Sequence, residues 1–266
     1  MLGGGGTQDL AQAVAAAGGL GMLPMGHSLP AQPAGALGMG FLIPFLPSFE
    51  GIPEATRGAR VVEFYWGDPD AAAVAAGHDA GALVSWQVGS GAEAVKAEQT
   101  GCDLVVIQGI EAGGHVRGTA PLDEVLRETL ADVTIPVVAA GGIGTPERVR
   151  ELMDAGADAV RIGTRFLAAP EADVHPQYVA ALIAGSAGDT VLTAHFDDGG
   201  SWPGTVRVVR ESLDGAQVAG NRSTMPPAHG SANPGGMPWY AGLSIDHVHR
   251  SQSAAEIVAE LTSLLD

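Results

Sequence analysis

The chain has 266 residues, the size of one large α/β domain, and 46% of them are hydrophobic, which is enough for a large core. Thirty acidic and thirteen basic residues give a net charge of −17, a field that excludes nucleic acid and anionic membranes as partners. The single Cys102 excludes an internal disulfide, and no apolar run reaches the roughly 18–20 residues that a membrane helix needs. The first residues, MLGGGGTQDL, lack the Lys or Arg that opens a secretory signal peptide. We therefore expect a cytoplasmic protein.

Short apolar runs alternate with alanine-rich helical stretches, which is the rhythm of βα units. Asp9 is the expected N-cap of the first helix, and Thr145 with Pro146 the expected start of the fifth. The expected strands are 20–23, 41–45, 61–64, 82–86, 103–107, 136–139 and 158–162. The expected helices are 9–17, 71–77, 91–100, 121–131, 145–155 and 253–265.

Continuous apolar runs such as DLVVIQ and IPVVAA predict parallel strands buried on both faces. Seven strands are expected, whereas a closed (β/α)₈ barrel has eight. The segment before Asp9 contains no strand, so we expect an α/β fold of the TIM (β/α)₈-barrel type that lacks its first strand. That strand would lie upstream of Met1, or else the barrel closes differently. The short segment between Leu23 and Phe41 predicts an abbreviated or missing helix.

The βα rhythm breaks after about Ala168, and the following stretch is rich in Gly, Pro, Asp and Ser. We therefore divide the chain into a barrel with the cofactor site at 1–184, a loop-rich excursion or lid at 185–240, and a closing segment with a C-terminal helix at 241–266.

Three glycine-rich loops each follow a predicted strand. They are Gln108-Gly-Ile-Glu-Ala-Gly-Gly-His115, Ala140-Gly-Gly-Ile-Gly-Thr145 and Arg161-Ile-Gly-Thr-Arg-Phe166. Barrel active sites lie at the carboxyl ends of the strands, and the loops after the last two strands often bind phosphate. Glycines let main-chain N–H groups approach phosphate oxygens, so two such loops in succession predict a phosphate site, although each alone is more often a tight turn.

The runs IQGIEAGGHVRG and IPVVAAGGIGTPERVRELMDAGADAVRIGTRFL resemble the core of the nitronate monooxygenases, formerly called 2-nitropropane dioxygenases. DLAQAVAAAGGLGML is similar to the family's first helix and second strand, and MPWYAGLSIDHV to its closing Tyr-Ala-Gly segment. The resemblance covers most of 8–183 and 237–260. It implies an FMN-dependent oxidoreductase that oxidises alkyl nitronates or nitroalkanes with O₂; the sequence is also compatible with a homo-oligomer.

The resemblance also implies roles for individual residues. His115 aligns with the catalytic histidine, and its imidazole suits either deprotonation of a neutral nitroalkane or, when protonated, binding of the anionic nitronate. The alternative is that His115 is a solvent-exposed loop residue without a catalytic role. Residues expected near the flavin ring are Gln108, Gly113 and Gly114. Residues expected around the ribityl phosphate are Gly141, Gly142, Arg161, Ile162, Gly163 and Thr164.

Other signals are given a structural interpretation. Glu111 is expected to cap a helix rather than orient His115, and the segments Asp246–His249 and His195–Asp198 are expected on the surface, with no metal ligated. The four tryptophans are expected in core or lid packing rather than in a stacking platform. They are Trp66, Trp86, Trp202 and Trp239.

Two other functions stay open from the sequence. A related FMN enzyme would take hydride from NAD(P)H and reduce a quinone or an enoyl-thioester. A barrel without its first strand could instead have lost catalysis and act as a binding module.

Overall fold

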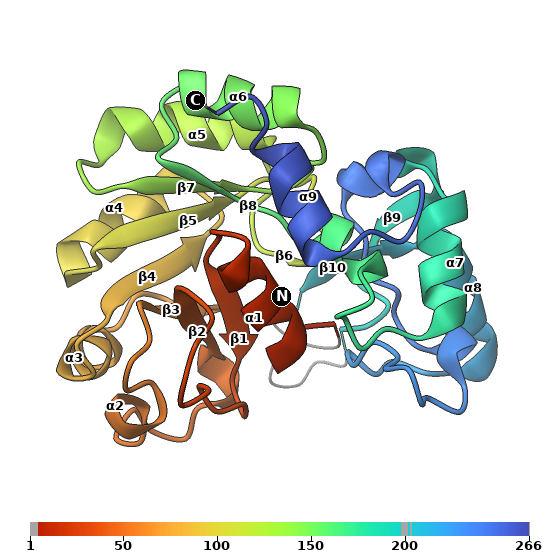
Figure 1. The fold of residues 1–266 in the computed structure, drawn as a ribbon, viewed down its shortest axis with the longest axis horizontal. Helices are drawn as coiled ribbons and strands as arrows, with labels where there is room; N and C mark the ends of the chain where they lie inside the picture. The colour runs from red at the N-terminus through yellow and green to blue at the C-terminus, as the bar shows by residue number, and fades with distance from the viewer. Residues whose placement is uncertain (1–4, 198–201, 203, 266) are drawn as a thin grey trace.

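The computed structural model describes residues 5–197, 202 and 204–265. Its centre is an all-parallel seven-stranded sheet in the order β1-β2-β3-β4-β5-β7-β8, the curled sheet of a TIM-type barrel (Figure 1). Its strands are β1 (Gly21–Pro24), β2 (Leu37–Leu42), β3 (Val61–Tyr65), β4 (Leu83–Val88), β5 (Leu104–Gln108), β7 (Val137–Ala140) and β8 (Ala159–Arg161). All seven predicted strands are confirmed, although the second lies earlier than the predicted 41–45: β2 spans Leu37–Leu42, and Ile43–Phe45, which contains Pro44, forms a 3₁₀ helix.

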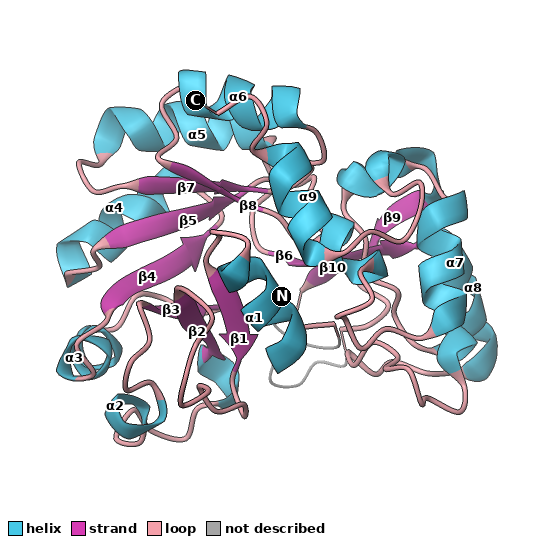
Figure 2. Ribbon diagram, viewed as in Figure 1, coloured by secondary structure: helices cyan, strands magenta, loops and turns pink. Residues whose placement is uncertain are grey.

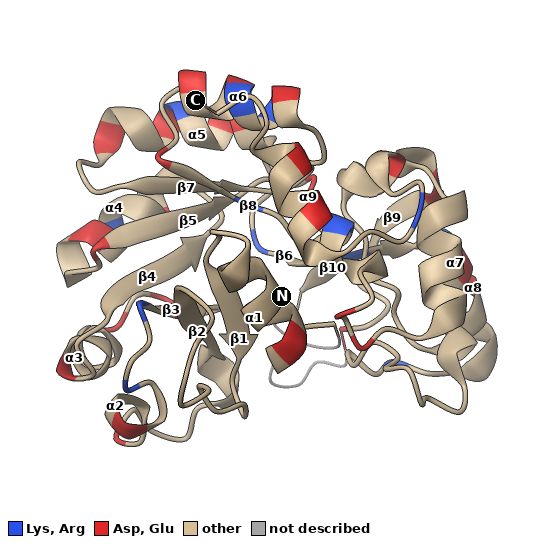
Figure 3. Cartoon of the chain, viewed as in Figure 1, with Lys and Arg blue, Asp and Glu red and all other residues tan. Residues whose placement is uncertain are grey.

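Helices line the outer side of the sheet, with α3 to α6 in succession along it (Figure 2). The helices of the barrel are α1 (Gln8–Ala16), α2 (Ile52–Ala55), α3 (Ala71–Asp79), α4 (Gly91–Thr100), α5 (Leu122–Asp132), α6 (Pro146–Asp154) and α9 (Ala254–Leu261). No helix lies between β1 and β2 in residues 25–36, as their short length predicts. Asp and Glu are spread over the outer helices (Figure 3). None of the helices in the described chain is long and apolar enough to cross a membrane.

The two edge strands of the sheet, β1 and β8, are not paired with each other in the described residues. Helices α1 and α9 pack together beside this opening. Between them an apolar cavity reaches into the barrel, where Leu10 of α1, Leu261 of α9 and Val106 of β5 are among its lining residues. The sheet therefore has the curvature of a barrel but stays open along one seam.

The region 185–240 has more regular structure than the sequence predicts. It contributes β9 (Thr190–Thr193) and β10 (Thr205–Val209) to an antiparallel sheet with β6 (Gly114–Val116), and also contains α8 (Arg210–Ala219). Helix α7 (Pro176–Ala184) precedes it. Because β6 belongs to the first glycine-rich loop, the region is tied to the barrel by backbone pairing. The division at 184 and 240 stays a prediction.

The surface placement expected for His195–Asp198 is wrong for Phe196. This residue lies in a turn but is fully buried, packed with Val206 and Val208 under the second sheet. Asp198 lies outside the described residues. The Asp246–His249 segment is exposed at Asp246 and His249, but Leu243–His247 forms a 3₁₀ helix, so its residues do not alternate as on a strand.

Helix starts follow local capping chemistry. The prediction of Thr145 and Pro146 is confirmed, since Thr145 Oγ1 accepts from Arg148 N at 3.1 Å. Asp9 as N-cap is wrong: Thr7 Oγ1 accepts from Leu10 N at 2.9 Å, and Asp9 lies in the first turn. There its charge favours the helix dipole without making the cap.

We expect Thr7→Ala to lower the free energy of unfolding by about 1 kcal/mol, because it removes the cap and the bond from Thr7 Oγ1 to Glu171 O. Asp9→Ala should cost less than about 0.5 kcal/mol, as only an exposed dipole interaction is lost. Urea unfolding of both variants measures the difference. A larger loss for Asp9→Ala would return the capping role to Asp9.

Candidate active site

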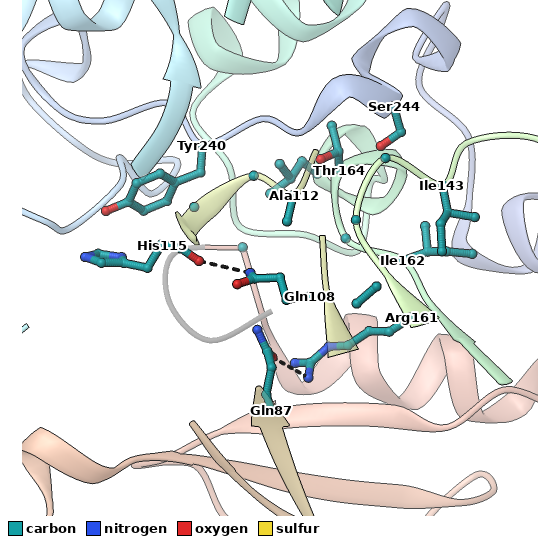
Figure 4. A pocket seen from close by; sticks show the side chains of 18 of the residues that line it. Gln87, Gln108, Ala112, His115, Ile143, Arg161, Ile162, Thr164, Tyr240 and Ser244 are labelled. Atoms are coloured by element: carbon teal, nitrogen blue, oxygen red, sulfur yellow. Dashed lines mark hydrogen bonds between the residues drawn. The ribbon is translucent and has the colours of Figure 1, made fainter. Parts of the chain in front are cut away.

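One cavity lies at the carboxyl ends of β5, β7 and β8, where the three glycine-rich loops meet (Figure 4). All ten residues predicted for the site line it. They are Gln108, Gly113, Gly114, His115, Gly141, Gly142, Arg161, Ile162, Gly163 and Thr164. The convergence follows from topology, because parallel strands bring their carboxyl ends to the same edge.

The turns around the cavity need glycine. Gly141 and Gly142 have φ of +118° and +70°, in the region that side chains with a Cβ rarely adopt. A Cβ on Gly142 would lie 2.8 Å from the Cβ of Glu111, and one on Gly113 would lie 2.4 Å from the Gly242 nitrogen. A side chain at Gly142 or Gly113 would therefore collide with a neighbouring loop, and the glycine residues themselves line the cavity.

Thr164 adds a hydroxyl beside these turns. Its Oγ1 accepts from Gly242 N at 2.9 Å, which leaves the hydroxyl hydrogen to donate to a ligand. The bond also joins the loop after β8 to the Tyr240-Ala-Gly242 segment, which the sequence places far away.

Arg161 has its guanidinium away from these turns. The side chain crosses toward β3 and β4, where Nη1 donates to Gln87 Oε1 at 3.0 Å and to the Glu63 carboxylate (Figure 4). Its main chain lies beside Gly163, but its charge lies at the floor of the cavity. The motif alone gave no sign of this direction, because neither Glu63 nor Gln87 is near it in sequence.

Gln108 and Tyr65 hold the loop that carries His115. Gln108 Nε2 donates to the His115 carbonyl oxygen at 3.0 Å, and its Oε1 accepts from Arg117 N at 3.1 Å. The Tyr65 hydroxyl lies 2.7 Å from the same His115 oxygen and 3.0 Å from Gln108 Oε1. Burial raises the pKa of Tyr65, so the hydroxyl stays protonated and able to donate.

His115 is a buried strand residue with 4% of its surface exposed, so the solvated-loop alternative is wrong. Its ring stacks on Trp202, with centroids 3.5 Å apart and planes 9° apart, and meets the edges of Trp66 and Tyr240. Neither ring nitrogen has a hydrogen-bond partner of normal geometry in the described residues. Burial lowers the pKa to about 3, against smaller opposing effects of the Trp202 backbone and Asp197, so the imidazole is neutral.

Trp66 is the one non-glycine residue with positive φ in the described chain, at 62°. Such a conformation costs of order 1 kcal/mol and persists where the surroundings impose it. The Arg117 guanidinium lies 5.9 Å from its ring, and the turned backbone aims that ring at His115. The packing predicted for the tryptophans is confirmed in the core for Trp86 and Trp239, but Trp66 and Trp202 surround the candidate catalytic histidine.

Glu111 has the expected capping role. Its carboxylate accepts from Leu122 N, the first residue of α5, at 3.1 Å. The residues that sequence reasoning missed include Tyr65, Gln87, Trp202, Tyr240 and Ser244, all lining the cavity. Tyr65 ends β3 and directly follows the predicted strand 61–64, so attention to the residue after every predicted strand could have found it. Tyr240 belongs to the segment that resembles the family's closing Tyr-Ala-Gly, which could have pointed to it, whereas Trp202 had no such signal.

Comparisons with known proteins agree with this geometry. A family model described as nitronate monooxygenase matches residues 50–263. A nitronate monooxygenase of Pseudomonas aeruginosa is 38% identical over 140 residues, 50% of this chain and 40% of that protein. Alignments with the first curated relatives span 32–56% of those proteins' own length.

Two solved structures match nearly the whole chain. FabK from Thermotoga maritima has a TM-score of 0.80 and 26% identity, covering 98% of this chain and 90% of that one. The nitroalkane oxidase from Streptomyces ansochromogenes has a TM-score of 0.78 and 26% identity, covering 99% and 94%.

The lowered pKa of His115 predicts a pH-dependent stability. In the unfolded chain this histidine binds a proton below about pH 6.5, whereas in the folded protein it does so only near pH 3. Its contribution to the free energy of unfolding is therefore constant above about pH 6.5 and falls as the pH drops from about 6.5 to about 3. Between pH 7.5 and 5.0 we expect the wild type to lose about 2 kcal/mol more unfolding free energy than His115→Gln. Urea unfolding at both pH values tests this, and parallel losses would mean that His115 titrates normally.

Proposed function

The chain belongs to the nitronate monooxygenase family, and from this premise we propose that it oxidises alkyl nitronates or nitroalkanes with O₂ by means of bound FMN. The single observation that supports this most is the meeting of the three glycine-rich loops around one cavity beside a neutral His115. Enzymes of this family are oxidoreductases and flavoproteins. A small anionic or nitro substrate and a cytoplasmic location fit the same proposal.

The residues present suit FMN. Glycine turns at Gly141 and Gly142, where a Cβ would collide or be strained, offer bare main chain for a phosphate, together with Gly163 and the Thr164 hydroxyl. Ile162 lies between these groups and Arg161 in the same lining. The flavin would supply electron acceptance, and the protein supplies binding and orientation.

Gln108 and Gly113–Gly114 also line the cavity and belong to the same loop as His115, and they would contact the flavin ring. Gln108 already uses its oxygen and one N–H to fix the His115 backbone. Its second N–H remains for a ligand in this cavity.

His115 acts in this proposal as the base for a neutral nitroalkane. The α-carbon C–H bond breaks, the proton moves to an imidazole nitrogen, and the electron pair remains on the substrate as a nitronate. A neutral imidazole can accept this proton, and the negative charge of the nitronate formed beside it would stabilise the imidazolium that burial alone disfavours. The surrounding rings of Trp66, Trp202 and Tyr240 limit the access of water to it.

The visible spectrum of the purified protein tests the function. We expect FMN absorbance, after reconstitution where needed, that bleaches on anaerobic addition of ethyl nitronate and returns with O₂. Bleaching by NADH instead would favour the reductase, and a protein that never takes up FMN would favour the binding module.

His115→Asn should keep the flavin spectrum but lower kcat/KM for neutral nitroethane by roughly 100-fold or more, because the base is lost. Turnover of preformed ethyl nitronate, which needs no deprotonation, should fall far less. The exposed His249 provides a matched control, and His249→Asn should behave as wild type. Full activity of His115→Asn with nitroethane would refute the assignment of the base.

A further inference from the structure

Arg161 is the sole lysine or arginine among the described residues that line the cavity. The chain carries a net charge of −17, and its acidic residues are distributed around the outside (Figure 3). Such a field opposes the entry of any anion, so an anionic substrate needs a local positive group. His115 is buried among aromatic rings and does not supply one.

The guanidinium is held in a fixed position at the cavity floor. Arg161 Nη1 donates to Gln87 Oε1 at 3.0 Å and to Glu63, whose side chain is 3% exposed, while that of Arg161 is 21% exposed. Glu63 lines the apolar cavity of the barrel interior and Gln87 lines the site, and Arg161 lies between the two spaces. The positive group is therefore nearer to the site than its counter-ion.

Donors remain on this guanidinium for a ligand. It has five N–H groups in a planar fork, and both bonds described above involve Nη1. A fork of this kind matches two oxygens on one planar atom, as in a carboxylate. A nitronate has the same planar pair of oxygens and a negative charge.

We propose that Arg161 selects the charge of the substrate: its guanidinium binds the O–N–O group of an anionic nitronate in preference to a neutral nitroalkane, and Glu63 behind it moderates the attraction. The inference rests on the proposed function and adds the residue that recognises the anion.

Two single variants change the net charge of the Arg161–Glu63 pair in opposite directions. Glu63→Gln leaves it at +1, the wild type is neutral, and Arg161→Gln leaves it at −1. The double variant Glu63→Gln/Arg161→Gln is neutral again and leaves no charge unpaired, so it separates the loss of Arg161 from mere exposure of an unpaired Glu63. Arg161→Lys keeps the positive charge but lacks the planar pair of N–H donors. This conservative variant keeps the test possible if the Gln variants do not fold.

The probe is sodium nitrite, which carries the same O–N–O group and charge as a nitronate. FMN-loaded protein is titrated anaerobically at constant ionic strength, and the flavin absorbance reports the Kd without turnover. We expect the Kd to rise in the order Glu63→Gln, wild type, double variant, Arg161→Gln, with Arg161→Gln weaker than wild type by roughly tenfold or more and Arg161→Lys in between. The Kd of neutral nitroethane should change less than about threefold.

A surface control removes charge without touching the site. Arg150 lies on α6, half exposed and paired with Asp154, and Arg150→Gln should leave the Kd of nitrite unchanged. A double variant that binds nitrite as tightly as wild type, or an equal effect on nitroethane, would overturn the role of Arg161.

The outcome is separable from that of the proposed function. The expected order of nitrite affinities in a protein that does not oxidise ethyl nitronate would support anion selection and reject the function. A protein that oxidises ethyl nitronate but whose Kd for nitrite does not change when Arg161 is replaced would support the proposed function and reject anion selection by Arg161.

Discussion

The site depends on two side chains that bind one carbonyl oxygen, that of His115. Tyr65 at the end of β3 and Gln108 at the end of β5 both reach it, so the first glycine-rich loop is fixed to two strands of the barrel. The same loop forms β6, and Val206 of β10 pairs with His115 in the second sheet. Barrel, loop and second sheet therefore meet at one backbone position, and the neutral ring attached to it is held in place from both sides.

Sequence reasoning succeeded where local pattern decides structure. Continuous apolar runs marked all seven parallel strands, because strands buried on both faces leave no alternation of polar residues. The glycine loops marked the cavity, because the ends of parallel strands converge. It failed where a distant partner decides. The short strands β9 and β10 are stabilised by pairing with β6 and by Phe196 beneath them, and neither shows in a local window.

The same limit applies within the site. Trp66 has a left-handed backbone conformation that a tryptophan rarely adopts, and the stacking of Trp202 on His115 joins residues far apart in sequence. The direction of Arg161 is set by Glu63 on a strand across the barrel. The glycine-rich motifs correctly predicted which main-chain segments line the cavity. They did not predict its charges, one arginine and one neutral imidazole, because these depend on packing with distant residues.

The open seam of the barrel has a consequence for how the cofactor would affect stability. The loop after β8 contributes Gly163 and Thr164, yet β8 is a short strand with a strand neighbour on one side alone among the described residues. A phosphate held between this loop and the one after β7 would act as a clamp on the edge strand. Binding of FMN and ordering of β8 are then thermodynamically linked, so the melting temperature should rise with the concentration of free FMN. Hydrogen exchange should slow most in β8 and the segment that follows it.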